Sequence, residues 1–115
     1  MDFDLLFMAV TPSDWKKLSE SGTISPGKLD DNSYLRAFQG KDAEEIINKH
    51  FEGEDSVMLL VLDPLRIQSP LKQTKEADYP IVAIQGDISI DTVIDKIRLK
   101  NNKEGKFSVH VKHFD

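Results

Sequence analysis

The sequence predicts an α+β domain, and three observations lead to that class. Residues 33–63 read as strand, helix, strand, with an amphipathic helix between a short apolar run and the most hydrophobic run of the chain. Residues 93–99 and 107–111 alternate apolar and polar side chains on either side of a turn-rich segment, as a β-hairpin does. At 115 residues the chain suits one domain with one core. We therefore expect residues 1–115 to form a single domain of about two helices and about six to eight strands, mostly antiparallel in the second half.

The first expected elements are a strand and a helix. Residues 3–10 form an apolar run of strand length. Thr11 or Ser13 can then accept a hydrogen bond from the free N–H groups of a first helical turn, which predicts a helix over residues 13–21. Gly22 is a natural end for this helix, because glycine readily adopts the left-handed conformation that terminates helices.

Trp15 lies within this predicted helix, on the same face as an apolar neighbour one turn later. We expect it to anchor the core, with stacking against a ligand as the alternative. Residues 22–32 contain Gly, Pro and Asp-Asp without a period, which predicts a loop with one short strand at residues 23–24. A loop of this length in a small domain is often functional, so it could border a pocket.

The central unit begins with a strand over residues 34–38, which Arg36 interrupts. Asp42 is expected to cap a helix that runs to about residue 51, since one face of this segment is apolar. Residues 56–62 are apolar without alternation, which indicates a strand covered on both faces. The residues of the apolar helix face are Ala43, Ile46, Ile47, His50 and Phe51.

Shorter elements follow this unit. Residues 65–67 and 70–73 are predicted as short edge strands, where a proline is tolerated. Residues 75–79 read as a polar connection and residues 81–84 as a second buried strand. Asp91 is expected to cap a single helical turn before the final hairpin.

Composition excludes several classes of function. Lys and Arg total 15 and Asp and Glu total 20, a net charge of −5, so the chain lacks the basic surface that nucleic acids and anionic membranes attract. No apolar run approaches the roughly 20 residues that span a bilayer. The absence of cysteine excludes disulfides, thiolate zinc sites and a cysteine nucleophile, and it agrees with a reducing compartment. We therefore expect a cytoplasmic protein with neither a nucleic-acid nor a membrane partner.

Neither a metal site nor a catalytic constellation can be assigned from the sequence. The histidines are His50, His110 and His113, and the last two would face opposite sides of a strand. No serine has a G-x-S-x-G context, and the chain has no glycine-rich phosphate loop. Most acidic residues fall on helix faces and loop ends, where contact with solvent is the default.

Arg36 is the strongest single candidate for a binding residue. A guanidinium inside an apolar strand needs a carboxylate, a phosphate or solvent at its head. Two interpretations follow: Arg36 points to water or pairs with a neighbouring acid, or it binds an anion in a cleft. Lys72 and Gln85 are weaker candidates, for which an exposed position on a strand is the alternative.

Several of these segments, taken in order, resemble the bacterial family known as domain of unknown function 952. The resemblance is carried by Trp15 and the Gly22 turn, by Tyr34-Leu35-Arg36, by Lys49-His50-Phe51-Glu52-Gly53, by residues 58–64, and by Ile84-Gln85-Gly86-Asp87-Ile88 followed by Asp91-Thr92-Val93. It covers most of the chain. The resemblance implies a fold similar to ADP-ribosyltransferases and RNA 2′-phosphotransferases, with two small, mostly antiparallel sheets. It also implies a nucleotide-type cleft between those sheets, with NAD or a related nucleotide as ligand.

The sequence departs from the family pattern at its polar positions. Arg36 stands where the family strand has a histidine, and Phe38 stands where it has a serine. Residues 82–86 lack the histidine and tyrosine of a later family segment, and Glu76 is the nearest candidate for an acid expected after Lys72. Because few groups remain for acid–base chemistry, no catalytic residue is assigned.

Three hypotheses on function follow. The first is a ligand-binding domain without catalytic activity. The second is a transferase that uses NAD or another nucleotide, which requires Arg36 and at least one carboxylate in one concave pocket. The third is a protein-interaction module that self-associates through edge strands around residues 65–73 or through the C-terminal hairpin. The residues expected to line the cleft are Tyr34, Arg36, Phe38, Lys72 and Gln85.

Overall fold

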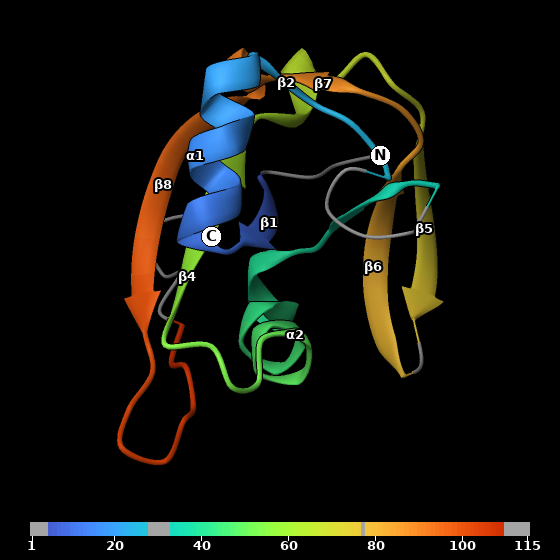
Figure 1. The fold of residues 1–115 in the computed structure, drawn as a ribbon. Helices are drawn as coiled ribbons and strands as arrows, with labels where there is room; N and C mark the ends of the chain where they lie inside the picture. The colour runs from blue at the N-terminus through green and yellow to red at the C-terminus, as the bar shows by residue number, and fades with distance from the viewer. Residues whose placement is uncertain (1–4, 28–32, 77, 110–115) are drawn as a thin grey trace.

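The structure, a computed structural model, describes residues 5–27, 33–76 and 78–109, which form two α-helices and eight strands (Figure 1). All strand pairs in this part of the chain are antiparallel, in sheets of order β1-β4-β8, β2-β7 and β3-β6-β5. The predicted α+β class, with two helices and antiparallel sheets, is confirmed. The helices are α1 (Pro12–Ser21) and α2 (Ala43–His50), and the strands are β1 (Leu6–Val10), β2 (Thr23–Ile24), β3 (Leu35–Ala37), β4 (Ser56–Leu62), β5 (Leu71–Glu76), β6 (Tyr79–Ile84), β7 (Ile88–Ser89) and β8 (Val93–Lys100).

Strand β4 is the centre of the core. It lies between β1 and β8, and all of its residues except the first are buried. Because side chains alternate along a strand, its two faces contribute to two different hydrophobic clusters. Each such Leu, Ile or Val stabilises the fold by roughly 1.5–3 kcal/mol when fully buried. The prediction of a strand covered on both faces is therefore confirmed. One face carries Met58, Leu60 and Leu62, and the other carries Val57, Leu59 and Val61.

Helix α1 covers the first of these clusters, and its ends follow the predicted chemistry. The Thr11 hydroxyl accepts a hydrogen bond from the backbone N–H of Asp14 at 3.2 Å. At the other end Gly22 has φ 79° and donates its N–H to the carbonyl of Leu18. Trp15 packs against the cluster as a half-buried anchor, with the ammonium of Lys96 at 5.7 Å from its ring centroid.

Helix α2 covers the second cluster through Ala43, Ile46 and Ile47. The predicted cap at its start is wrong, because the side chain of Asp42 makes no capping hydrogen bond. A 3₁₀ turn, Gly40–Asp42, runs directly into the helix, and the N–H of Ala43 already donates to the carbonyl of Gly40. The turn therefore gives the first N–H of the helix a backbone acceptor, while the Asp42 side chain accepts from none of the N–H groups of the first turn. Neither α1 nor α2 has the length and apolar character that crossing a membrane requires.

Two connections differ from the prediction. Residues 65–67 do not form a strand: the 3₁₀ turn Pro64–Arg66 occupies this segment, and the carboxylate of Asp63 accepts from the N–H of Leu65 at 3.0 Å. The polar connection predicted over residues 75–79 is wrong for most of its length, because β5 and β6 pair as far as Glu76 and Tyr79. The helical turn predicted near residue 91 is present as Ile90–Thr92, but Ser89 caps it instead of Asp91.

The expected strand after β8 is also wrong as far as residue 109, and its remaining positions, with His110 and His113, lie outside the described residues. The side chain of Asn48 accepts from the N–H of Phe107 at 2.7 Å and donates to its carbonyl at 2.9 Å. Phe107 is thereby fixed on α2, where its ring is buried in the second cluster. The backbone groups that a hairpin would need are taken by a side chain of the helix.

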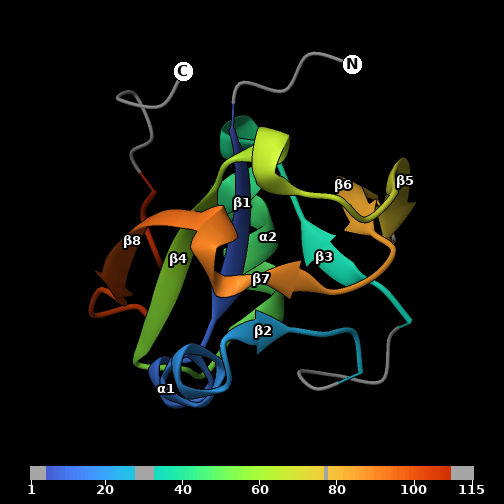
Figure 2. The same ribbon diagram turned by 90° about the horizontal axis from the view of Figure 1, so that it is seen from above.

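Within the residues that the structure describes, one bridging pair joins the two three-stranded sheets at their facing edges. Phe7 and Phe38 exchange both backbone hydrogen bonds at 2.9 Å, which links β1 to the end of β3. Beyond this bridge the described residues of β1 and β3 pair within their own sheets, and the two strands separate (Figure 2). Residues of both strands, together with Phe38 of the bridge, line one cavity, and we call this space between the sheets the cleft.

Candidate functional site

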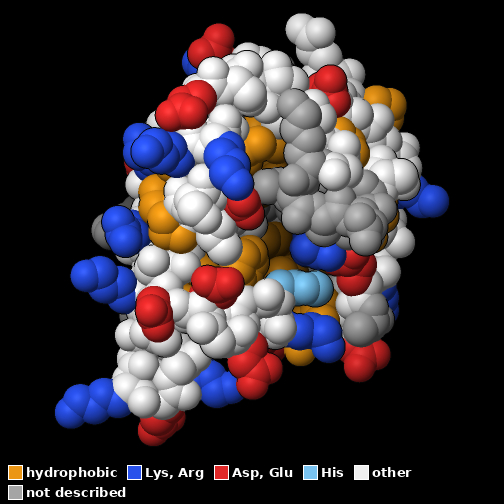
Figure 3. Space-filling view, viewed as in Figure 1, with side chains coloured by type: hydrophobic (Ala, Val, Ile, Leu, Met, Phe, Trp, Pro, Cys, Tyr) orange, Lys and Arg blue, Asp and Glu red, His pale blue; other side chains and the backbone are white. Residues whose placement is uncertain are grey.

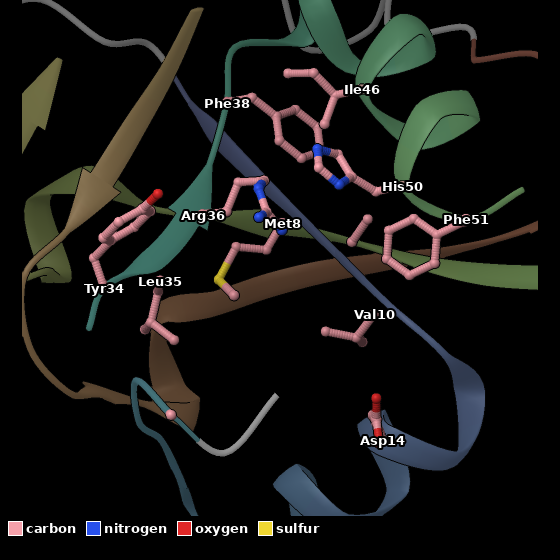
Figure 4. A pocket seen from close by; sticks show the side chains of 12 residues that line it. Met8, Val10, Asp14, Tyr34, Leu35, Arg36, Phe38, Ile46, His50 and Phe51 are labelled. Carbon is pink, nitrogen blue, oxygen red and sulfur yellow. The ribbon is translucent and has the colours of Figure 1, made fainter. Parts of the chain in front are cut away.

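A cavity of about 330 Å³ opens in the cleft between β1 and β3. Its size is near the lower end of the range of about 300–1,000 Å³ that is usual for small-molecule sites. On the corresponding face of the molecule, apolar side chains lie recessed with a histidine and basic side chains beside them (Figure 3). The lining residues are Met8, Ala9, Val10, Asp14, Gly27, Tyr34, Leu35, Arg36, Phe38, Ile46, His50 and Phe51 (Figure 4).

Arg36 is fixed in this cavity by Glu76. Its Nε and Nη2 donate to the two carboxylate oxygens of Glu76, the second bond at 3.1 Å, so the pair is bidentate. The hydroxyl of Tyr34 donates to the same carboxylate at 2.5 Å. The side chains of Arg36 and Glu76 are 21% and 19% exposed, so the group is mostly shielded from solvent. One carboxylate thus orients two side chains that line the cavity.

The electrostatics of Glu76 agree with this arrangement. Burial raises the pKa of its carboxyl, but the hydrogen bonds from Arg36 and Tyr34 and the charges of Arg36 and His50 outweigh burial. The net pKa of Glu76 therefore lies below its ordinary value of 4.5. At neutral pH the group holds Arg36 as a charged pair.

His50 is a pocket residue that the sequence interpretation did not select. It is the last residue of α2, and its ring points from the helix toward the part of the cavity where Arg36 lies (Figure 4). The available signal was its place in the sequence, because His50 shares a helix face with Ile46 but comes at the end of that face. In the structure its side chain is exposed at the rim of the cavity. A histidine at the end of an apolar face could have been recognised as a residue at the border of a cavity.

Three of the five predicted cleft residues line the cavity: Tyr34, Arg36 and Phe38. Phe38 is 1% exposed and forms the end wall next to the bridge. Lys72 shares a face of its sheet with Arg36 but lies across β6 on the far strand, about two strand spacings or roughly 10 Å away. Gln85 follows β6, exposed, with its N–H bound to the carbonyl of Pro70 at 2.8 Å. Neither Lys72 nor Gln85 belongs to this cavity's lining.

Asp14 also lines the cavity, from the first turn of α1. The requirement set for an enzyme, Arg36 and a carboxylate in one concave pocket, is therefore met geometrically. Within the described ranges, no group of three or more His, Asp and Glu side chains could hold a metal ion.

A second cavity of about 340 Å³ lies on another part of the surface, beside the hairpin of β5 and β6. Its polar residues include Lys41, Lys75 and Gln73, and all three are exposed. Among the residues that the structure describes, it has no hydrogen-bonded group comparable to that of Arg36, Tyr34 and Glu76. We therefore regard the cleft as the candidate functional site. The residues that line the second cavity are Gln39, Lys41, Asp42, Gln73, Thr74, Lys75, Pro80, Ile81 and Val82.

Comparison with solved structures identifies the same fold in CC0527 from Caulobacter crescentus, a target of the Northeast Structural Genomics Consortium. Its crystal structure superposes with a TM-score of 0.78 at 17% identity, over 90% of this chain and 93% of that one. The crystal structure of a double mutant of CC0527 gives 0.77 at 17% identity, with the same coverage. A solution NMR structure gives 0.71 at 16% identity, over 90% and 91% of the two chains. At these identities the likeness establishes the fold alone.

No curated protein matches the chain in sequence. A family model described as "Protein of unknown function (DUF952)" matches residues 9–108, which include every helix and strand except the start of β1. The resemblance inferred from Trp15, Arg36 and the segments around them is thereby confirmed. The chain belongs to the DUF952 family, whose function is uncharacterised.

Proposed function

We propose that this DUF952 domain binds a small phosphorylated ligand of nucleotide type in the cleft, with Arg36 as the phosphate-binding residue. The observation that supports this proposal is the position of Arg36, which lines the cavity while Glu76 orients it from behind. A guanidinium that is already ordered loses less conformational entropy when it binds an anion. His50 adds a second basic side chain to the lining.

The apolar part of the cavity suits the remainder of such a ligand. Met8, Ile46 and Phe51 provide hydrophobic surface around the polar groups, and this mixture is typical of small-molecule sites. The cavity volume of about 330 Å³ favours a mononucleotide-sized group over a complete dinucleotide. A dinucleotide such as NAD would place one half inside and extend the other across the surface.

The separation of β1 and β3 also supports an ADP-ribosyltransferase-like arrangement. That similarity implies a nucleotide cleft between two small sheets, and the cavity lies between two sheets joined by one bridge. Since fold does not determine function, the side chains in the cleft are the main support for a nucleotide ligand.

A transferase that acts on NAD is the second candidate, because Asp14 and Arg36 share the cavity. This candidate predicts that the protein releases nicotinamide from NAD and that Asp14→Asn abolishes the release. Turnover equal to the rate without protein would exclude it. Self-association through β5 is not proposed, because Lys72 and Lys75 place charges on that edge, which disfavours strand pairing between chains.

Thermal unfolding with and without AMP, ADP-ribose and NAD tests the binding proposal. A ligand at about a hundred times its dissociation constant should stabilise the protein by about 2.7 kcal/mol, a rise of several degrees in Tm. Arg36→Ala should remove the rise. The matched control is Arg98→Ala, which deletes an exposed arginine of β8 and should keep it.

Each variant is compared with its own ligand-free Tm, because Arg36→Ala also leaves Glu76 without its main partner. A rise that persists in Arg36→Ala would contradict the role of Arg36. The absence of a rise with any of the three ligands would contradict the nucleotide site itself.

A further inference from the structure

The cavity has a second polar end, formed by Asp14 on the opposite side from Arg36. Asp14 lies in the first turn of α1, where the hydroxyl of Thr11 holds its backbone N–H at 3.2 Å. Its carboxylate points from the helix into the cavity, past Val10 (Figure 4). The local geometry therefore fixes the backbone and leaves the carboxylate directed toward a ligand.

This carboxylate is not used by the rest of the described structure. Among the residues in the described ranges, Asp14 takes part in no ion pair, and its side chain makes no hydrogen bond. An ionised carboxylate is only an acceptor, so its two oxygens require donors from water or from a ligand. Its neighbours on the lining, such as Val10 and Met8, are apolar and offer no donor. A bound molecule would have to supply hydrogen-bond donors at this end.

We propose that Asp14 accepts hydrogen bonds from the sugar hydroxyls of the ligand, so that the cleft selects ribonucleotides over deoxyribonucleotides. This inference rests on the proposed function, because it takes the phosphate to be held at Arg36. In a nucleotide the ribose is adjacent to the phosphate, and its hydroxyls are good donors to a carboxylate, as in dinucleotide-binding sites. Asp14 is then a specificity-determining residue that contacts the ligand directly.

Calorimetric titration with AMP, 2′-deoxy-AMP and 3′-deoxy-AMP tests this selection. Hydrogen bonds to a charged group are strong, so wild-type protein should bind AMP at least about ten-fold more tightly than the analogue that lacks the recognised hydroxyl. Asp14→Ala removes the acceptor and should bind all three nucleotides with similar affinity, whereas Asp14→Asn keeps an uncharged acceptor of the same size and should show a reduced preference. The matched control is Glu20→Gln, an exposed carboxylate on the same helix, which should retain the wild-type preference.

Two results would overturn the inference while leaving the nucleotide site intact. One is equal binding of AMP and both analogues by wild-type protein. The other is tighter binding of AMP by Asp14→Asn, which would mean that Asp14 repels the phosphate. If wild-type protein bound none of the three nucleotides, the proposed function would fail, and the inference with it.

Discussion

The ion pair between Arg36 and Glu76 should contribute measurably to stability, and Glu76→Gln tests this. The substitution keeps the shape of the side chain but removes the charge that accepts from Arg36 and Tyr34. Breaking a fully buried pair costs about 3–5 kcal/mol, whereas an exposed pair contributes at most about 1 kcal/mol. The two side chains are 21% and 19% exposed, so we expect an intermediate loss of about 2 kcal/mol in the free energy of unfolding.

Urea unfolding at neutral pH measures this loss. The fluorescence of Trp15, the single tryptophan, reports the transition, because this side chain packs against the core. With an m-value of about 1–3 kcal/mol per molar urea, the midpoint should fall by about 1 M. The matched control is Glu52→Gln, an exposed glutamate after α2, which should leave the midpoint unchanged. An unchanged midpoint in Glu76→Gln would refute the view that this pair orients Arg36.

Acidification should remove the same contribution. The pKa of Glu76 in the folded protein lies below its ordinary value of 4.5, so the unfolded chain takes up the proton first. The stabilisation is therefore complete above pH 4.5 and is lost as the pH falls through the folded-state pKa. The difference in free energy of unfolding between wild type and Glu76→Gln should shrink in acid. A difference that stays constant on acidification would contradict this assignment.

Three further substitutions have defined expectations, each measured by urea unfolding. Thr92→Val should leave the free energy of unfolding unchanged or raise it by about 1 kcal/mol, because the Thr92 hydroxyl is buried without a hydrogen-bond partner in the described structure. A clear loss of stability would mean that the hydroxyl does have a partner. Gly86→Ala should destabilise the protein by about 1–3 kcal/mol, because a Cβ there would lie 2.6 Å from the hydroxyl oxygen of Ser69. Adding Ser69→Gly should restore part of the lost stability. If it restores none, the clash with Ser69 is not the cause of the loss. Asn48→Ala should lower the free energy of unfolding by about 1–3 kcal/mol and speed amide exchange at Phe107, since both backbone groups of Phe107 lose their partner. Unchanged exchange would contradict the role of Asn48 in holding Phe107.

The elements that sequence predicted well are those with strong local signals. The run of apolar residues in β4 has no alternation, and a run of this length is typical of a strand covered on both faces. Helix α1 begins at a hydroxyl cap and ends at a glycine with positive φ, and both signals lie within a few residues of the helix. Local chemistry was sufficient for these boundaries.

The errors arose where a distant partner decides the local structure. The alternation after β8 suggested a strand, but Asn48, 59 residues earlier in the chain, takes the backbone of Phe107. Lys72 lies on β5, which β6 separates from β3, and Gln85 is exposed just after the end of β6, so neither lines the cavity. The order of segments in the sequence does not reveal how far apart two strands lie across a sheet.

For Arg36 the sequence offered two interpretations, contact with water or a neighbouring acid, or binding of an anion in a cleft. The pair with an acid is confirmed, and anion binding stays a prediction. In the structure Arg36 pairs with Glu76 and also lines the cavity. His50 was not selected because its spacing on α2 is the same as that of the core residues, and its place at the end of the apolar face is what distinguishes it.

The most direct test of the cleft as a nucleotide site is an NMR titration of the ¹⁵N-labelled protein with AMP. If the cleft binds AMP, backbone amide shifts should change with saturation and cluster at residues of the cavity, including Ala9, Arg36 and His50. The same titration of Arg36→Ala should leave these amides unperturbed. Shifts confined to the second cavity, at residues such as Gln73 and Val82, or no shifts at all, would contradict the account.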